Sequence, residues 1–223
     1  MDKTPKYMVG IDEVGRGPIA GPVAVCAFIC QDNFFDDIEI KTPLRDSKKL
    51  SAKQRGEWFE YLKLAQKDKK CDFSVSYVSA ENIDKFGISK AIKKALETSL
   101  LKIVKDCKNL RVGVGAPEPE GRRGISEQDF YNPERFFIYL DGGLKAPEQF
   151  INQETIIKGD ELHKVISCAS IIAKVSRDRV MENFAKEYPE YGFENHVGYG
   201  TKAHYDAIKK RGTCPIHRKT FIH

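Results

Sequence analysis

Three short apolar segments of the sequence end in the same way, on a carboxylate beside a glycine. Asp12 and Glu13 end the first segment, Asp141 the second and Asp160 the third. Apolar runs of this length are typical of strands, and a single acid at a strand end usually does no more than start a turn. Parallel neighbouring strands, however, end at one shared crevice of their sheet. We therefore expect a sheet that brings these acids together.

A cluster of this kind needs a positive partner. Two carboxylates about 4 Å apart repel each other by roughly 4 kcal/mol at an effective dielectric constant near 20. Oxygen ligands suit the hard cations Mg²⁺ and Mn²⁺. Zinc fits poorly, because the five histidines form no pair or Cys/His cluster with the spacing of metal ligands. The acids are therefore interpreted as a candidate site for Mg²⁺ or Mn²⁺.

Asp12 and Glu13 are adjacent in the sequence, which raises a geometric question. Successive side chains of a strand point to opposite faces of the sheet. If both acids bind the same cations, the strand must end or twist between them, or one carboxylate must approach from a different angle.

Apolar runs, alternating segments and helical periods along the chain predict strands and helices, and so an α/β fold. Strands are expected at residues 7–11, 23–29, 71–80, 136–143 and 154–161. Ser51 and Gln54 form a capping box that opens a charged helix, and a second helix with apolar residues at a 3.6-residue period starts at Ile88. A third helix is expected at 165–186, with small residues suited to close packing, and a shorter one in the last 35 residues.

Length and composition set the broad class. The 223 residues suit one domain, and residues 112–134, rich in Gly, Pro and charge, are expected to form a surface loop or insertion. The six cysteines include no CxxC pair, which favours a reduced, cytoplasmic setting. No run approaches the roughly 18 apolar residues of a membrane helix, so no membrane contact is expected.

Charge is unevenly distributed along the chain. The net charge of +5 is compatible with nucleic acid but does not by itself indicate it. Residues 41–70 hold ten Lys and Arg against four Asp and Glu, whereas residues 31–40 hold four acids and no base. A solvated helix face is the simplest interpretation of such a basic run, and a nucleic-acid contact is the alternative.

The loop that follows the first acids, GRGPIAG at residues 15–21, is rich in glycine. Its spacing misses the dinucleotide fingerprint GxGxxG by one residue, and Pro18 would interrupt a helix there. Glycines let a backbone approach a ligand closely and present its N–H groups, and Arg16 adds a fixed cation. The simpler alternative is a tight hairpin turn with a solvent-facing arginine.

Several longer motifs resemble those of ribonuclease HII, the type 2 ribonuclease H, in its bacterial form. They occur in the family's order and run from residue 10 to residue 221, with the poorest match at 112–134. The motifs are GIDEVGRGPIAGPV, DSKKLS, YLDGG, KGDELHKVISCASIIAKVSRD, HVGYGTKAH and PIHRKTF.

The resemblance implies an RNase H-like core, with a mixed sheet flanked by helices, in residues 1–186. It also implies a helical C-terminal extension, residues 187–223, that contacts the substrate and packs on the same domain. The family's metal-binding carboxylates, which serve a two-metal-ion mechanism, fall on the acids identified above: Asp12, Glu13, Asp141 and Asp160.

The same resemblance assigns substrate contacts. Gly15, Arg16 and Gly17 would read the ribonucleotide 2′-hydroxyl at an RNA–DNA junction together with Tyr199, which would pack against the deoxyribose on the 3′ side. Backbone N–H and C=O groups suit this task because the 2′-hydroxyl both donates and accepts. Candidate phosphate contacts are Lys48, Lys49, Ser170, Lys174 and Arg177.

At two positions the sequence departs from the family pattern, and one pair of residues has a second interpretation. Many bacterial members have Lys where this chain has Val197, so a phosphate contact there is missing or is supplied by Lys202. Gly143 replaces a frequent asparagine after the Asp-Gly pair. Arg177 and Asp178 could equally form a structural ion pair. None of these positions is among the four acids, so the substitutions concern substrate affinity.

The function implied by the resemblance is a metal-dependent endoribonuclease. It would hydrolyse the RNA strand of RNA–DNA hybrids and incise 5′ of ribonucleotides embedded in duplex DNA, leaving 5′-phosphate and 3′-hydroxyl ends. Two alternatives stay open. An RNase H-fold binding protein without catalysis has no need of four intact acids, and a resolvase-like nuclease has no need of a 2′-hydroxyl reader. Protein partners are not indicated, and a monomer is the default expectation.

Overall fold

A computed structural model describes residues 7–36, 38, 40, 42–44, 47–107, 110 and 132–223 of the chain. The expected surface insertion at 112–134 lies outside these described residues except for its last three positions.

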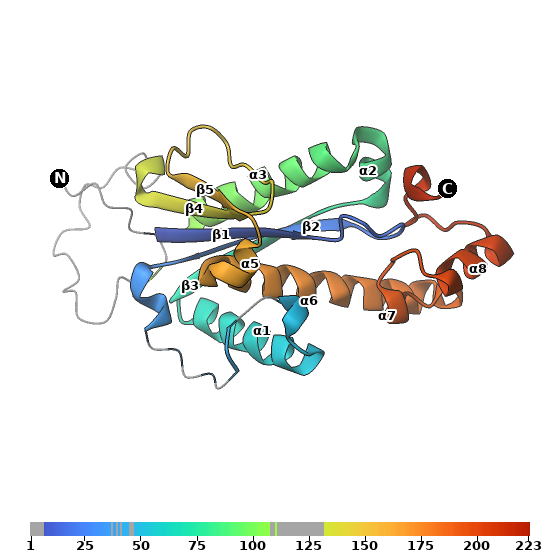
Figure 1. Cartoon of the computed structure of the whole chain (residues 1–223), viewed down its shortest axis with the longest axis horizontal. Coiled ribbons are helices and arrows are strands. Elements are labelled where there is room, and N and C mark those ends of the chain that lie inside the picture. The colour runs from blue at the N-terminus through green and yellow to red at the C-terminus, as the bar shows by residue number, and fades with distance from the viewer. Residues whose placement is uncertain are drawn as a thin grey trace.

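One five-stranded sheet organises the described part of the chain (Figure 1), in the order β3-β2-β1-β4-β5. The strands are β1 (Tyr7–Val14), β2 (Val23–Cys30), β3 (Cys71–Val78), β4 (Phe136–Asp141) and β5 (Gln153–Ile156). β2 pairs antiparallel with β1 and with β3, whereas β4 pairs parallel with β1 and with β5. The sheet is therefore mixed, as the family resemblance implied, and its β1–β4–β5 half supplies the parallel strand ends.

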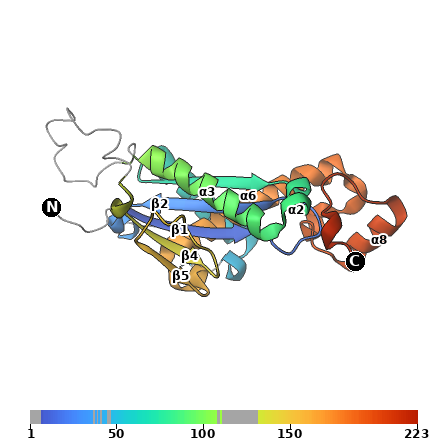
Figure 2. The same cartoon turned by 90° about the horizontal axis from the view of Figure 1, so that it is seen from above.

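One face of the sheet is covered by α3 (Ile88–Asp106), which follows the short helix α2 (Ala80–Phe86). Its apolar stripe, repeating as the sequence predicted, packs on alternate residues of β1, β2 and β4 in the larger of the two buried clusters that flank the sheet. Seen from above, α3 lies along the sheet (Figure 2). This layer holds the strands rigidly on the side away from the acids.

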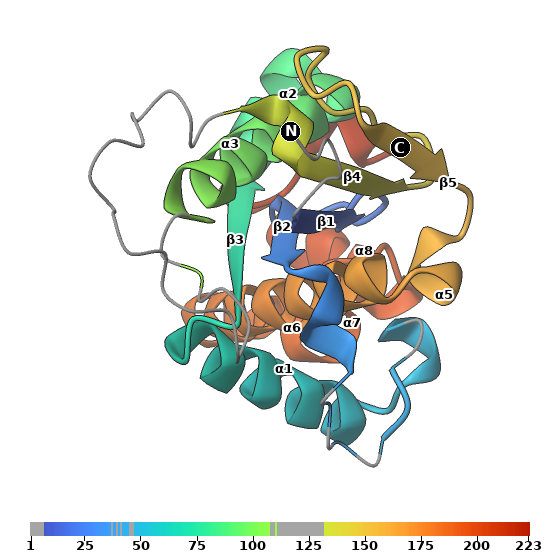
Figure 3. The ribbon, with the colours of Figure 1, turned by 90° about the vertical axis from the view of Figure 1, so that its left-hand side faces the viewer.

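The other face is covered by α6 (Lys164–Glu187), and α1 (Ala52–Lys67) packs outside α6. Both sides of the capping box predicted for α1 are present, between Ser51 and Gln54. The end-on view shows the resulting layers, with α3, the sheet, α6 and α1 in succession (Figure 3). At Gly10 of β1, an added Cβ would lie 2.1 Å from the Val165 carbonyl oxygen, so α6 touches the strand backbone directly.

The C-terminal part lies at the far end of α6 (Figure 1). It contains α7 (Phe193–His196) and α8 (Lys202–Arg211), which pack with the end of α6 around a small core of their own. The chain then returns toward α2, where the carboxylate of Asp84 accepts hydrogen bonds from the backbone of Lys219 and Thr220. No helix among the described residues is long and apolar enough to cross a membrane.

Candidate active site

Three of the four acids meet in the folded chain. One carboxylate oxygen from each of Asp12, Asp141 and Asp160 lies within 4.8 Å of the others. Asp12 and Asp160 are buried and Asp141 is half-buried. The expectation that these acids would meet is confirmed for this trio, which we call the acid cluster, although only Asp141 is the last residue of a strand.

Strand register explains why Asp12 and Asp141 face each other. Ile11 of β1 pairs with Leu140 of β4, and both side chains point into the core under α3. Because side chains alternate along a strand, Asp12 and Asp141, one residue further on, both point to the α6 face. A parallel pair in this register places two carboxylates side by side.

Asp160 reaches the cluster by a route that the sequence did not reveal. β5 ends at Ile156, so Asp160 does not close a strand but lies in the four-residue helix α5 (Gly159–Leu162). Lys158 before it has a left-handed φ of +58°. The Gly159 N–H donates to Asp141 Oδ1 at 2.7 Å, and a Cβ on Gly159 would lie 2.5 Å from Ile166. The turn thus packs Gly159 closely against Ile166 and connects Asp141 to the segment that carries Asp160.

Glu13 lies outside the acid cluster. β1 continues through Val14, so strand alternation persists and the Glu13 side chain leaves the face that Asp12 occupies. Its Oε1 accepts a hydrogen bond from Arg16 at 3.2 Å, and its Oε2 is buried without a hydrogen-bond partner among the described residues. Of the arrangements expected from the sequence, an end of the strand between Asp12 and Glu13 is excluded, since β1 runs on to Val14. The metal role of Glu13 stays a prediction.

The electrostatics of the cluster fit a divalent cation. Burial, together with the charges of Glu13 and Asp141, raises the pKa of Asp12 to about 8, against a hydrogen bond from Ser170. Burial and the charge of Asp141 also raise the pKa of Glu13, and the Arg16 guanidinium opposes this. Ionised together, these carboxylates are destabilising, so the donor set is complete only with positive charge among the oxygens. Oxygen donors alone fit Mg²⁺ or Mn²⁺.

Replacing one acid by its amide should therefore stabilise the metal-free protein. Folding obliges Asp12 either to take up a proton or to bury its charge, and Asp12→Asn removes this cost, so at pH 7.5 with EDTA we expect a melting temperature at least about 4 °C above wild type, from a cost of a few kcal/mol. Because the folded pKa of Asp12 is raised, wild type loses stability as pH rises from about 4 to about 8, and the gap should widen over that window. Added Mn²⁺ should stabilise wild type and not Asp12→Asn. A lower melting temperature for the variant in EDTA would contradict this account.

The DSKKLS segment lies beside the cluster. Ser47 is buried and its hydroxyl is 2.8 Å from that of Ser170 on α6, which in turn hydrogen-bonds Asp12. Ser170 is therefore held inside the protein by a hydrogen bond that orients Asp12, and its phosphate contact stays a prediction. Lys48, 79% exposed, has Nζ at 3.5 Å from Asp160 Oδ2, and Lys49 pairs with Glu161. Both lysines stay candidates for phosphate contacts.

The loop at residues 15–22 joins the antiparallel strands β1 and β2 and so is a hairpin connection, although with eight residues it is longer than the tight turn of the simpler interpretation. Arg16 and Gly17 are exposed at its tip. Tyr199, 47% exposed, lies over it, since a Cβ on Gly17 would be 3.7 Å from the Tyr199 ring. The expected reader residues are thus adjacent in space, although about 180 residues separate them in sequence.

Two further α6 residues differ from expectation. Arg177 is fully buried and donates to three backbone carbonyls, so it does not face a phosphate. Asp178 pairs with Lys174 at 2.8 Å rather than with Arg177, which corrects the alternative of an Arg177–Asp178 ion pair. Lys174 is about one-quarter exposed and stays a candidate for a phosphate contact.

Sequence reasoning missed several buried polar residues around this region: Ser47, His204, His217 and Arg218. All lie in the motifs quoted above, but a sequence does not show which polar side chains are buried. The one available signal was the adjacent His217 and Arg218 in the motif PIHRKTF.

Comparisons with known proteins agree with this geometry. The sequence model of the family described as Ribonuclease HII matches residues 9–124 and 137–223. A ribonuclease HII of Endomicrobium trichonymphae is 40% identical over 214 residues, covering 96% of this chain and 84% of that protein. One from Clostridium acetobutylicum is 38% identical over 215 residues, covering 96% and 72%. The RNase HII structure solved as a PCNA:RNase HII complex from Archaeoglobus fulgidus has a TM-score of 0.66 and 26% identity, covering 97% of this chain and 96% of that chain.

A mixed sheet flanked by helices, a cluster of three carboxylates beside it and the match to the family model together define the chain as a hydrolytic nuclease of the ribonuclease H class. Within that class, the chain belongs to the Ribonuclease HII family. It is an endoribonuclease of RNA–DNA hybrids, and a catalytically inactive binding protein or a resolvase is not favoured. The family match leaves out residues 125–136, which largely overlap the insertion expected to match worst.

Proposed function

We propose that this enzyme incises duplex DNA on the 5′ side of an embedded ribonucleotide, besides cleaving RNA–DNA hybrids, and leaves 5′-phosphate and 3′-hydroxyl ends. The observation that carries the proposal is the continuity of the site. β1 holds Asp12 and leads within three residues into the loop of Gly15, Arg16 and Gly17, where Tyr199 lies next to Gly17. The loop that would recognise the ribose therefore follows directly on the strand whose Asp12 would act on the neighbouring phosphate.

Each part of the site has a proposed task. Asp12, Glu13, Asp141 and Asp160 would hold Mg²⁺ or Mn²⁺, which when bound would polarise the scissile phosphate and lower the pKa of the attacking water. Ser170 keeps Asp12 oriented, and the Gly159 N–H does the same for Asp141. These contacts would hold Asp12 and Asp141 ready to bind the cations.

The loop and Tyr199 would select the substrate. A 2′-hydroxyl can accept from a backbone N–H at the loop tip and donate to a carbonyl there, which a deoxyribose cannot do. The exposed Tyr199 ring offers an apolar face for the sugar on the 3′ side, where its packing favours DNA. Lys48, Lys49 and Lys174 would bind phosphates and set the register on the duplex.

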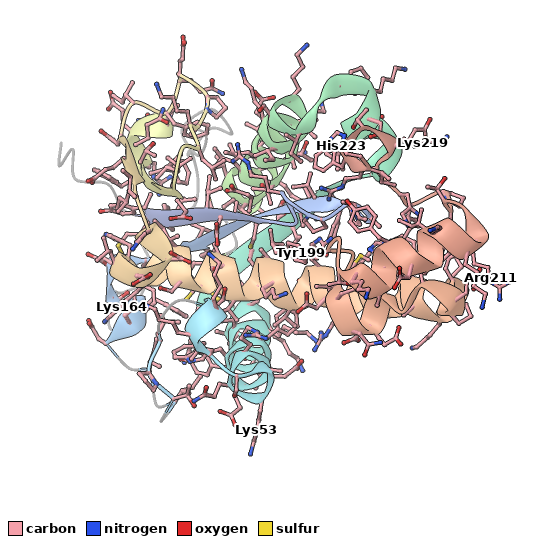
Figure 4. All side chains as sticks on the ribbon, turned by 45° about the vertical axis from the view of Figure 1, so that its right-hand side comes forward. Lys53, Lys164, Tyr199, Arg211, Lys219 and His223 are labelled. Carbon is pink, nitrogen blue, oxygen red and sulfur yellow. The ribbon has the colours of Figure 1, made fainter. Side chains whose placement is uncertain are left out.

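Several basic residues lie on the helices farther from Tyr199. Figure 4 shows Tyr199 between the sheet and α6, with Lys53, Lys164 and Arg211 further out on three different helices. On α1 the charges are partly paired, since Glu60 contacts both Lys63 and Arg179. The beginning of the basic run at 41–70, near Lys48, is thus a better candidate for nucleic-acid contact than the α1 face.

The cysteines bear on the cellular compartment in which the protein works. All six cysteines are free and five of them are buried, which supports a reducing, cytoplasmic compartment. We further propose that the enzyme acts as a monomer, which sedimentation at the concentration of the activity assay tests.

The function is tested with an end-labelled duplex that contains one ribonucleotide, incubated with Mg²⁺ or Mn²⁺. The expected product is a single cut on the 5′ side of the ribonucleotide, with a 3′-hydroxyl that a DNA polymerase extends directly. The matched duplex with a deoxyribonucleotide at that position should stay intact. Equal cutting of both duplexes would refute the proposed selectivity and favour a nuclease without a 2′-hydroxyl reader.

A further inference from the structure

Two arginines are buried completely and have no carboxylate partner. The side chains of Arg177 on α6 and Arg218 in the C-terminal tail are both 0% exposed. Neither forms an ion pair with any described residue. Burial, together with the charge of Arg177, lowers the pKa of Arg218 to about 9, which still leaves it charged at neutral pH. Burying such a charge costs several kcal/mol, so its retention needs an explanation.

Arg177 binds the return side of the loop at 15–22. Its Nε donates to the Pro22 carbonyl at 2.9 Å and its Nη2 to the Ala20 carbonyl at 3.3 Å. Its Nη1 donates to the Val197 carbonyl at 2.9 Å. Val197 has a φ of +44°, an unfavourable region for a β-branched residue. Arg177 thus holds the loop and the strained residue two positions before Tyr199 with one guanidinium.

Arg218 binds the loop tip itself. Its Nη2 donates to the Gly15 carbonyl at 2.7 Å, its Nη1 to the Arg16 carbonyl at 3.2 Å, and its Nε to the Gly21 carbonyl at 2.9 Å. Five carbonyls of the eight-residue loop are therefore turned inward onto two guanidinium groups. A carbonyl has two lone pairs, so those at the tip can still accept from a hydroxyl outside.

Two glycines of the loop have a left-handed backbone and close neighbours. Gly15 has a φ of +87°, and a Cβ there would lie 2.3 Å from Arg177 Nε. Gly21 has a φ of +85°, and a Cβ there would lie 2.4 Å from the sulfur of Met181. The left-handed backbone and the close approach of Arg177 at Gly15 and of Met181 at Gly21 therefore favour glycine at these two positions.

Tyr199 is held by a separate chain of hydrogen bonds. The Tyr199 carbonyl accepts from His204 Nδ1 at 2.9 Å, so His204 Nε2 carries no proton in the neutral ring. The Cys214 N–H donates to His217 Nδ1 at 2.9 Å, so His217 carries its proton on Nε2. The two Nε2 atoms are 3.0 Å apart, and the assignment gives one donor and one acceptor. Both buried rings are satisfied as neutral groups.

The two systems join at adjacent residues of the tail. His217 ends the chain that reaches Tyr199, and Arg218 begins the contacts to the loop tip. The Arg218 N–H also donates to the Ile19 carbonyl at 2.8 Å, and the Gly21 N–H to the Ile216 carbonyl at 2.8 Å, so this stretch pairs with the loop backbone. The tail therefore fixes the distance between the loop and the tyrosine.

We propose that Arg177 and Arg218 are positioning residues for substrate selection, which hold the loop tip and Tyr199 in the single arrangement that accepts a ribose 2′-hydroxyl. This proposal rests on the proposed function of the loop and Tyr199. It explains two buried cations without ion pairs, because six backbone carbonyls satisfy their donors and the outward face of the loop is left for ligand. Lys cannot replace either residue, since an ammonium lacks the planar fork that reaches three carbonyls at once.

The test is the kinetics of Arg218→Lys and Arg177→Lys on the single-ribonucleotide duplex, with the matched all-DNA duplex as competitive inhibitor. We expect kcat/KM to fall about 10-fold to 100-fold, as when one or two hydrogen bonds to a recognised group are lost. The inhibition constant of the DNA duplex should stay within twofold, and Mn²⁺ should still raise the melting temperature. Selection would then be lost while the fold, the metal site and general DNA binding persist.

Arg179→Lys is the matched control. Arg179 lies two residues beyond Arg177 on α6, is half exposed and pairs with Glu60 at 3.1 Å. Its kcat/KM should stay within twofold of wild type. If either Lys variant of the buried pair keeps its Mn²⁺ response and kcat/KM within threefold of wild type, the proposal is overturned for that residue.

A second variant covers the case in which the buried substitutions prevent folding. Asp84→Ala removes the surface carboxylate that anchors the tail backbone after Arg218. We expect a drop of about 3-fold to 10-fold in kcat/KM with the DNA inhibition constant unchanged, from loss of roughly 1 kcal/mol of tail anchoring. Wild-type values for Asp84→Ala would overturn the proposal. If wild type itself fails to distinguish the two duplexes, the proposed function fails instead, whatever the variants do.

Discussion

Asp141→Asn is expected to lower the rate of ribonucleotide incision by about 10³-fold or more. Asp141 is the acid of the cluster that is least buried and that connects β4 to the turn carrying Asp160. The amide keeps the shape of the side chain, and its oxygen can still accept from the Gly159 N–H, so the fold should persist. What is lost is one negative ligand for the cations, worth several kcal/mol of transition-state stabilisation, at 1.36 kcal/mol for each factor of ten.

The measurement is single-turnover incision at saturating Mn²⁺, so that weaker cation binding alone does not account for the loss. Glu154→Gln is the matched control, because Glu154 is an exposed carboxylate on the neighbouring strand β5. Its rate should equal that of wild type within twofold. A rate for Asp141→Asn within a few-fold of wild type would remove Asp141 from the chemistry and with it the role given to the acid cluster.

The strands and long helices could be predicted because each is encoded by its own local pattern. Short apolar runs located β1 and β2, alternation located β3, and the apolar period from Ile88 located α3. Asp12 and Asp141 could be placed together because each follows the apolar run of a strand, and parallel pairing brings such positions into register. Local sequence and tertiary structure agree at these positions, which is why the pattern was sufficient.

For Asp160, the local sequence pattern predicted the wrong secondary structure. The segment ETIIKGDE was expected to be one strand, but β5 ends at Ile156 and a left-handed Lys158 starts a short helix. The turn exists because the Gly159 N–H binds Asp141, a residue 18 positions earlier in the chain. A contact at that range has no local signature, so the acid was found and its supporting element was not.

Arg177 was assigned to phosphate for a related reason. A sequence shows that an arginine carries charge, but whether the charge faces solvent or backbone depends on what covers the helix. Here the loop at 15–22 and the backbone of Val197 cover it, and they come from opposite ends of the chain. The burial of Ser170 was not predicted for the same reason, because its partner Ser47 lies 123 residues away.

The geometry of the whole site depends on how closely α6 approaches β1. Asp12 is on the strand, Ser170 and Arg177 are on the helix, and α5 with Asp160 immediately precedes the helix. The contact that sets this approach is at Gly10, where the Val165 carbonyl occupies the space of a Cβ. Backbone lies on both sides of this contact, so no rotamer change can make room for a methyl group.

Gly10→Ala is therefore expected to destabilise the protein by about 3 kcal/mol, the upper part of the usual range for overpacking, and to lower its melting temperature by about 6–12 °C. Urea unfolding followed by circular dichroism measures this. Gly56→Ala is the control, since Gly56 lies inside α1 with nothing within 4 Å of an added Cβ, and alanine there should stabilise by up to about 1 kcal/mol. The residual activity of Gly10→Ala, measured below its melting temperature, should fall as well, because moving α6 away from β1 separates Ser170 from Asp12. A Gly10→Ala protein as stable as wild type would mean that the helix can withdraw from the strand at little cost, and that this close contact does not hold the acid cluster together.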